Sequence, residues 1–188
     1  MIPLALLLLA VNDPLALNDV ERARLDRGEV LVTSVPVAGS PVPAACARAV
    51  IDAPPEKVWP VVWNCARYTQ TMPSIATSEL VERTATSTLC RVVVDLPFPL
   101  PDLMSLSRAE LTVEPGVRWR REWKMVEGDY DVNQGSFTLL PWGDGKTLAI
   151  YRVEARPKMP LPDWLLAKAQ GDRLPEMMER IRKEARTP

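Results

Sequence analysis

A short stretch near the middle of the chain carries the clearest chemical pattern, because it places one charge among apolar side chains. If residues 117–127 form a strand, alternate side chains share a face. One face then holds Val117, Trp119, Arg121, Trp123 and Met125. A buried charge without a partner is costly, so Arg121 should meet the polar end of a bound ligand, with the two tryptophan rings beside its guanidinium. The alternative is a structural carboxylate partner such as Glu110 or Asp131.

The other face of the same stretch holds Arg118, Arg120, Glu122 and Lys124. Basic and aromatic residues in alternation also occur in proteins that bind single-stranded nucleic acid. The chain has 23 Lys and Arg against 24 Asp and Glu, a net charge of −1, whereas nucleic-acid binding leaves a basic excess. We therefore expect a solvated strand face and no nucleic-acid partner.

Several kinds of catalytic and metal chemistry are excluded by what the chain lacks. It contains no histidine, which removes histidine bases, Ser-His-Asp and Cys-His nucleophiles and histidine zinc ligands. Its three cysteines, Cys46, Cys65 and Cys90, lack the spacing of a metal site or a disulfide framework, so they are predicted to be small buried core residues. Four carboxylates also show no paired spacing: Glu110, Glu122, Asp129 and Asp131. We predict no metal, no cofactor and no catalytic residue.

The composition is that of one globular domain. The chain has 188 residues, 47% of them hydrophobic and 25% charged, which is enough for one sizeable core. An apolar run at 4–11 is too short to span a membrane; it resembles the core of a secretory signal, but no basic residue precedes Arg22. We expect an N-terminal segment with a short helix at 1–28 and a ligand-binding domain at 29–188. The location, cytoplasmic or exported, stays open.

Local patterns predict the elements that must position Arg121. The expected helices, marked by capping residues, prolines and apolar periodicity, are 18–27, 52–64, 67–72 and about 161–186. The expected strands are 29–37, 44–51, 76–84, 88–96, 105–113, 117–127, 132–140 and 146–155. Short turns join most of the later strands, for example at Glu114-Pro-Gly116.

Consecutive strands with short turns imply an antiparallel sheet, and the long final helix is the only element large enough to cover one face. The predicted fold class is α+β: a helix-grip fold, in which a curved antiparallel sheet of about seven strands wraps around a long C-terminal helix, with two short helices after the first strand. A gap between such a sheet and helix is a natural apolar cavity. We expect a cavity of several hundred Å³ there.

Three segments carry a family resemblance. The first is Val50–Trp59 (Val-Ile-Asp-Ala-Pro-Pro-Glu-Lys-Val-Trp) with the turn Arg67–Pro73 after it. The second is the Pro-x-Pro segment Asp95–Asp102, and the third comprises Asn133–Leu139, Thr147–Val153 and the closing helix. Together they resemble the START/SRPBCC superfamily, the polyketide cyclase/dehydrase and lipid-transport class, over roughly residues 44–186.

The resemblance implies the helix-grip fold and a hydrophobic ligand, but it leaves the function open. The superfamily includes both lipid carriers and aromatase/cyclases. START-type lipid carriers also have an Arg-Asp-aromatic run after the Pro-x-Pro segment, where this chain has Leu103-Met104-Ser105. Their polar head-group contact is therefore not carried over, which favours an apolar ligand.

We predict a monomer that binds or carries a lipid, sterol or quinone and is not an enzyme. The alternatives are a polyketide cyclase/aromatase-type enzyme and a non-binding interaction module. The residues expected to line the cavity are Tyr68, Met72, Val92, Val94, Trp119, Arg121, Trp123, Phe137, Tyr151, Trp164 and Met178. Four apolar residues of the proline-rich loop should gate the cavity or contact a membrane transiently: Phe98, Leu100, Leu103 and Met104.

Overall fold

The computed structural model of the chain describes residues 16–40, 43–162, 164–165 and 172–186. Eight strands form one antiparallel sheet in the order β1-β2-β8-β7-β6-β5-β4-β3. The strands are β1 (Leu31–Val35), β2 (Ala44–Ile51), β3 (Ile75–Arg83), β4 (Ser87–Val94), β5 (Leu103–Glu114), β6 (Arg118–Gly128), β7 (Tyr130–Trp142) and β8 (Lys146–Pro157). The helices are α1 (Asp19–Asp26), α2 (Pro55–Trp63), the 3-10 turn η1 (Cys65–Arg67), α3 (Tyr68–Thr71) and α5 (Leu174–Ala185).

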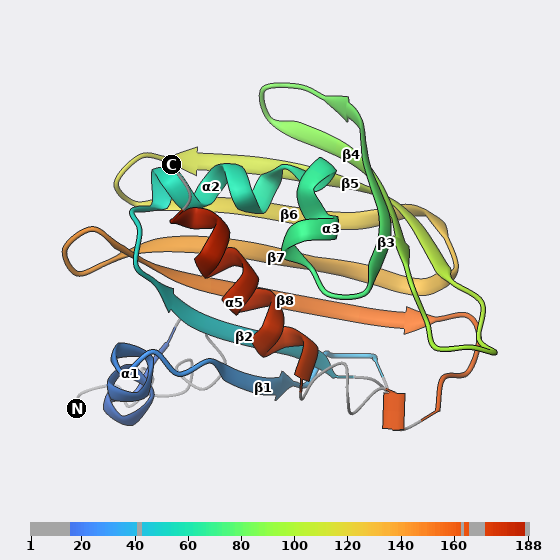
Figure 1. Ribbon diagram of the computed structural model, residues 1–188, viewed down its shortest axis with the longest axis horizontal. Coiled ribbons are helices and arrows are strands. Elements are labelled where there is room, and N and C mark those ends of the chain that lie inside the picture. The colour runs from blue at the N-terminus through green and yellow to red at the C-terminus, as the bar shows by residue number, and fades with distance from the viewer. Residues whose placement is uncertain (1–15, 41–42, 163, 166–171, 187–188) are drawn as a thin grey trace, which may run out of the picture.

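This arrangement confirms the predicted α+β helix-grip fold. The sheet curves behind α5, and α2 and α3 lie against the same face, which we call the helix-covered face (Figure 1). The sheet has eight strands where about seven were expected, because both N-terminal strands join it: β2 pairs with β8, and β1 pairs with β2. The two short helices α2 and α3 therefore follow the second strand, whereas they had been predicted to follow the first. Of the predicted closing helix, α5 is described, whereas 166–171 lie outside the described residues, as does the apolar run at 4–11.

The sequence explains where α2 begins and which side it buries. Pro54 has an extended backbone at the N-cap, and Pro55 occupies the first helical position, where a backbone N–H has no partner within the helix in any case. Val58, Val61 and Val62 recur at helical spacing, and all three are buried. This apolar stripe fixes α2 against the sheet.

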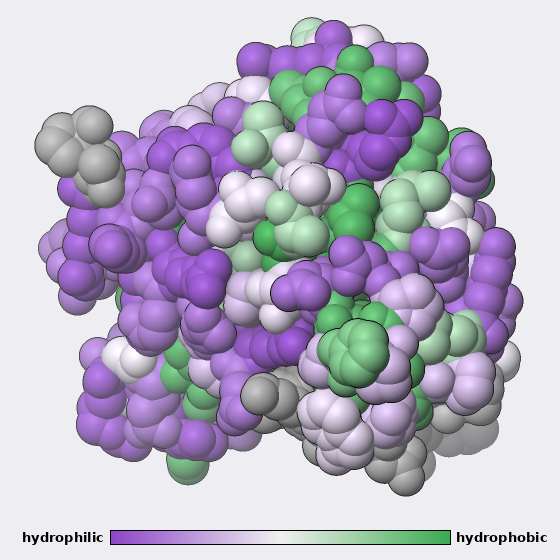
Figure 2. Space-filling view, turned by 45° about the vertical axis from the view of Figure 1, so that its right-hand side comes forward, coloured by the Kyte–Doolittle hydropathy of each residue, from purple (hydrophilic) through white to green (hydrophobic). Residues whose placement is uncertain are grey.

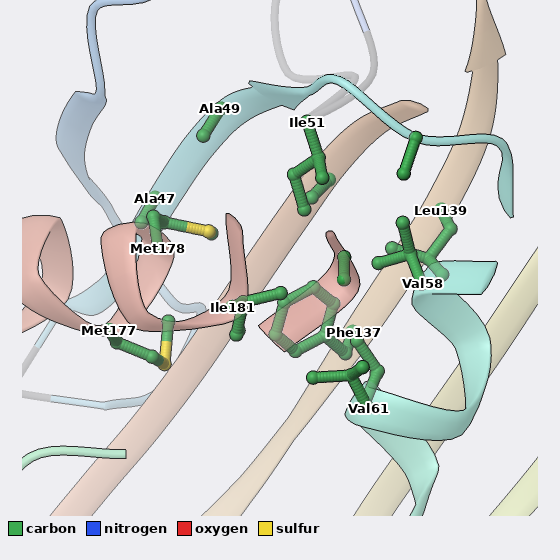
Figure 3. Close-up of a cluster of buried hydrophobic side chains, with 14 of the residues drawn as sticks. Ala47, Ala49, Ile51, Val58, Val61, Phe137, Leu139, Met177, Met178 and Ile181 are labelled. Carbon is green, nitrogen blue, oxygen red and sulfur yellow. The ribbon is translucent and has the colours of Figure 1, made fainter. Parts of the chain in front are cut away.

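The larger core fills one half of the interface between the sheet and the helices. It joins side chains from β2, β7 and β8 to side chains from α2 and α5 (Figure 3). In Figure 3 the Phe137 ring lies between Ile181 and Val61. Phe137 and Met178 are 1% and 0% exposed, so this half of the interface leaves no room for a ligand.

A second, smaller core lies on the opposite face of the sheet, which we call the outer face. Helix α1, predicted at 18–27, begins with a capping box in which Asn18 and Glu21 bind each other's backbone N–H groups. Leu25 of α1 is fully buried and packs with side chains of β1, β2 and β8: Leu31, Cys46, Leu148 and Ile150. The described part of the N-terminal segment is thus attached to the domain.

Two of the three cysteines are buried in the core as predicted, but they form a disulfide, which the prediction had excluded. Cys65 in η1 is bonded to Cys90 in β4, with the two Cα atoms 6.2 Å apart. The two cysteines are 25 residues apart, a spacing that has no signature in the sequence. Only the fold reveals the pairing, because it brings the turn after α2 against β4. Cys46 is a buried free thiol, as predicted.

Candidate functional site: two chambers under the sheet

Two adjoining chambers lie on the helix-covered face, beside the filled core. The first, of about 210 Å³, is the arginine chamber, and the second, of about 260 Å³, is the leucine chamber. The arginine chamber is lined by Tyr68, Met72, Ile75, Cys90, Val92, Val94, Ser105, Ser107, Arg121, Trp123, Tyr130, Asn133, Tyr151, Val153 and Ala155. The leucine chamber is lined by Pro43, Ala45, Val94, Leu96, Leu103, Tyr130, Val153, Ala155, Pro157, Leu161, Leu165, Arg173 and Leu174.

Four residues line both chambers, so the two spaces meet: Val94, Tyr130, Val153 and Ala155. Ala155 is exposed to solvent, so the combined cavity is not sealed. A cavity between the sheet and the helices was predicted from the order of the elements, and the structure has one. Its size lies near the lower end of the range of about 300–1,000 Å³ that is usual for small-molecule sites.

The arginine chamber exists because β5 presents small side chains to the helix-covered face. Ser105, Ser107 and Ala109 alternate along the strand and are all buried. Alternate residues of a strand share a face, and the two serines, which line the chamber, leave a hollow between the sheet and the helices. A larger apolar residue at Ser105 or Ser107 would fill the hollow.

Arg121 projects from β6 into this chamber, as the alternation in β6 predicted. The residue is only 4% exposed. Its Nη2 donates to Sγ of Cys90 at 3.8 Å, and its guanidinium lies 5.2 Å from the Trp123 ring and 5.7 Å from the Tyr68 ring. Of the two tryptophans predicted to flank Arg121, Trp123 lies beside it, whereas Tyr68 takes the place of Trp119.

No carboxylate among the described residues forms an ion pair with Arg121. The two structural partners considered from the sequence, Glu110 and Asp131, are both exposed, and Asp131 pairs with Arg156 instead. Nε of Arg121 is buried with no hydrogen-bond partner in the described part of the chain. The chamber therefore contains a charged donor group that the described protein does not satisfy.

Aromatic rings form the wall next to Arg121. The Trp123 and Tyr151 rings stack with centroids 5.5 Å apart, and Tyr151 meets the edge of Phe137 at 5.4 Å. Nε1 of Trp123 donates to Oδ1 of Asn133 at 3.2 Å. Gly135 makes this wall possible, since a Cβ there would lie 2.6 Å from the Trp123 ring and 2.1 Å from a backbone oxygen of β8.

Burial also sets the protonation of the tyrosines around the chamber. It raises the pKa of Tyr68 and the pKa of Tyr151 above their ordinary value, although the Arg121 charge acts in the opposite direction on both. Burial, with a contribution from the Asp129 carboxylate, raises the pKa of Tyr130 to about 12. All three are neutral phenols at physiological pH, and the Tyr68 hydroxyl donates to the carbonyl oxygen of Val62 at 2.9 Å.

The structure brings together seven of the predicted ligand-contact residues around the arginine chamber: Tyr68, Met72, Val92, Val94, Arg121, Trp123 and Tyr151. Three others, Trp119, Phe137 and Met178, lie in the filled core. Trp164 is 56% exposed and lines neither chamber. Sequence reasoning missed the small residues of β5 and Tyr130, although the alternation of serines in β5 was a usable signal.

The predicted gate residues divide into two groups. Phe98 at the tip of the β4–β5 loop is 97% exposed, whereas Leu103 is 4% exposed and lines the leucine chamber together with Leu96. Leu100 is half-buried against the same cluster, and Met104 is also half-buried. Viewed from this end, the molecule shows apolar surface in patches bordered by polar side chains (Figure 2).

A larger hollow of about 560 Å³ lies on the outer face of the sheet, over β5–β8. Several of its charged side chains have partners: Arg120 pairs with Glu122 at 3.2 Å, and Gln134 donates to Glu154 at 2.9 Å. Charged side chains line much of this groove, so it gives no reason to expect an apolar ligand. In the described part of the chain, no three His, Cys, Asp or Glu side chains gather as metal ligands would. Nor does any described helix have the length and apolar character needed to cross a membrane.

Comparison of the sequence with protein-family profiles identifies the family. The profile "Polyketide cyclase / dehydrase and lipid transport" matches residues 51–182. The chain belongs to this family. Comparison with curated proteins finds no sequence match.

Several solved structures share the fold. A STAR-related lipid transfer protein from Xanthomonas axonopodis aligns with a TM-score of 0.72 and 20% identity, over 84% of this chain and 94% of that one. The lipid transfer and protein localization domain of human StarD13 aligns with a TM-score of 0.67 and 16% identity, over 92% and 100%. The Zhui aromatase/cyclase from Streptomyces sp. R1128 aligns with a TM-score of 0.53 and 18% identity, over 76% and 85%. At these identities the likeness concerns the fold alone.

Proposed function

We propose that the protein binds a hydrophobic small molecule of the lipid, sterol or quinone class in the two chambers and does not transform it. The observation that carries the proposal is the pair of adjoining chambers between the sheet and its helices, with mostly apolar walls. Burial of apolar ligand surface supplies roughly 25 cal/mol per Å² before the costs of association. The names of the similar lipid transfer proteins agree with this class of ligand.

The composition of the chambers favours binding over cyclase chemistry. General acid–base catalysis needs a group that can gain or lose a proton near neutral pH. The described residues that line the chambers include no carboxylate, histidine or free thiol, and their tyrosines have pKa values raised by burial. An interaction module with a filled interior would have no use for the chambers.

We assign the β4–β5 loop to the side of the molecule that meets a membrane during ligand uptake. Phe98 is an almost fully exposed aromatic residue, and Leu96 and Leu103 on either side of it line the leucine chamber. An exposed apolar loop tip can enter the interface of a bilayer. Contact at this loop would place the chambers next to the lipid phase.

The test is to fill the cavity. Ala155→Trp places a large ring where the chambers meet, and Val126→Trp is the matched control, because Val126 is 62% exposed on the outer face. Native mass spectrometry of the purified protein should find a co-purified hydrophobic molecule in the wild type and the control, and none in Ala155→Trp. Equal ligand occupancy in all three proteins would place binding elsewhere and reject the proposal.

A further inference from the structure

Given the ligand binding proposed above, Arg121 bears on the chemistry of the ligand's head group. Arg121 is more than nine-tenths buried at the wall of the arginine chamber. A guanidinium carries five N–H donors. In the described structure one of its nitrogens meets only a disulfide sulfur at 3.8 Å, a weak acceptor, and Nε has no partner among the described residues.

Two other arginines with largely buried side chains, Arg48 and Arg182, differ from Arg121 in meeting acceptor oxygens, although Nε of Arg48 and Nη2 of Arg182 also have no partner in the described chain. Arg48, 7% exposed, pairs with Glu21 at 3.3 Å. Arg182 donates to the backbone oxygens of Val50 and Gly28 at 3.0 Å and pairs with Glu179. Where the fold uses a buried arginine for structure, it supplies acceptor oxygens. At Arg121 the cavity lies where those oxygens would be.

An unpaired buried charge is expensive, and an opposite charge with acceptor oxygens removes much of that cost. Two planar oxygens match the guanidinium fork in a bidentate arrangement. The Ser105 and Ser107 hydroxyls line the same chamber and can donate further hydrogen bonds to such a group. We propose that the arginine chamber binds the anionic head group of a single-chain amphiphile.

The charge of the chamber selects the kind of anion. Arg121 is the only charged side chain among the described residues that line it. One guanidinium neutralises one negative charge, as on a carboxylate. An alkyl phosphate monoester carries about −1.5 to −2 near pH 7, and the excess charge would be buried without a partner. A long-chain carboxylate is therefore the class of ligand that fits.

The leucine chamber accommodates the alkyl chain. It begins at Tyr130 and Val153, where the arginine chamber ends, and its walls are apolar apart from Arg173 and the Tyr130 hydroxyl. The two chambers, of about 210 and 260 Å³, together lie toward the small end of the range of ligand cavities. One chain fits this space, and a lipid with two long chains does not.

The test compares two probes that differ only in the head group, hexadecanoate and hexadecan-1-ol, by equilibrium dialysis. Wild type should bind the acid about 10–100-fold more tightly, which corresponds to a charge-assisted hydrogen bond. Arg121→Met should bind both probes equally. Arg120→Met is the matched control: Arg120 precedes Arg121 on β6, but it pairs with Glu122 on the outer face, and its variant should keep the wild-type preference for the acid.

The possible results separate this inference from the proposed function. If the wild type binds the alcohol as tightly as the acid, a hydrophobic site exists and the anion inference is wrong. If it binds neither probe, the inference of a single-chain amphiphile is wrong, whereas the proposed function is decided by the native mass spectrometry of wild type and Ala155→Trp. Hexadecyl phosphate should bind more weakly than hexadecanoate, and equal or tighter binding would overturn the charge argument. Arg121→Gln, which keeps two donors without the charge, replaces Arg121→Met if that variant does not fold, and it should also lose the preference.

Discussion

Removing the Cys65–Cys90 disulfide tests how far a covalent link determines the stability of the cavity wall. The double variant Cys65→Ser/Cys90→Ser opens a ring that spans a sequence separation of 25. In the chain-entropy treatment, a loop of this length constrains the unfolded state by about 3.5 kcal/mol at 25 °C. Unfolding entropies of about 2.1 cal/mol/K per residue over 188 residues convert this loss to a decrease in Tm of about 9 °C.

The assay is a thermal melt followed by circular dichroism, with and without a thiol reductant. Wild type should lose about 9 °C on reduction, and the double variant should start near that lower Tm and not respond to the reductant. Cys46→Ala is the control, because Cys46 is a free buried thiol and its variant should keep the full response. Three titratable thiols in unreduced, denatured wild type would refute the disulfide, and an unchanged Tm on reduction would refute the entropic argument.

Three further predictions follow from burial and backbone geometry. Gly135→Ala should cost about 3 kcal/mol or more, because its Cβ would lie 2.1 Å from a backbone oxygen; Gly116→Ala, which has open space but a φ of +76°, should cost only about 1 kcal/mol. Tyr130→Phe should be less sensitive to alkali than wild type between about pH 10 and pH 12. Phe98→Ser should change the free energy of unfolding by less than about 0.5 kcal/mol, whereas Leu103→Ala should lower it by about 2–4 kcal/mol. Phe98→Ser should also reduce the fraction of protein that sediments with anionic vesicles.

The sign of the alkaline effect follows from the direction of the pKa shift. The pKa of Tyr130 is higher in the folded state, about 12 against 10.0, so above pH 10 the unfolded chain releases a proton that the native protein keeps. Stability therefore falls as the pH rises through this window, by about 2–3 kcal/mol for the complete shift. Urea melts at pH 9 and pH 12 measure it. Equal alkaline losses of stability in wild type and Tyr130→Phe would contradict the assignment of the raised pKa to Tyr130. An unchanged affinity of Phe98→Ser for vesicles would contradict the membrane contact of the β4–β5 loop.

Local signals were sufficient for most of the fold. The Pro54-Pro55 entry and the apolar periodicity of α2 are read directly from sequence, and so are the turns that separate the strands, because each depends on a few neighbouring residues. The alternation in β6 placed Arg121 on the helix-covered face for the same reason. The position of Cys65 against Cys90 depends on how the sheet and helices pack, and short-range patterns carry no information about that.

The candidate site was only partly predictable. Period-two alternation gives Trp119 and Trp123 the same face, but it does not say which of them meets a helix and which meets a cavity. Trp119 joins the core that α2 covers, whereas Trp123 has open space beside it because β5 offers Ser105 and Ser107 there. The hollow is made by small residues of β5, which give no hydrophobic signal in a sequence, and the alternation of the two serines was the only cue to it.

The two edges of the sheet bear on whether the chain associates with copies of itself. An edge strand offers unpaired backbone groups to any other strand, and proteins limit this with short, irregular or charged edges. Strand β1 is only five residues long, and β3 has two register shifts and exposed charges at Glu79, Glu82 and Arg83. Neither edge therefore suits continuation of the sheet into a neighbouring molecule. Light scattering on the purified protein should accordingly give the mass of a single chain, 21.0 kDa for the full sequence.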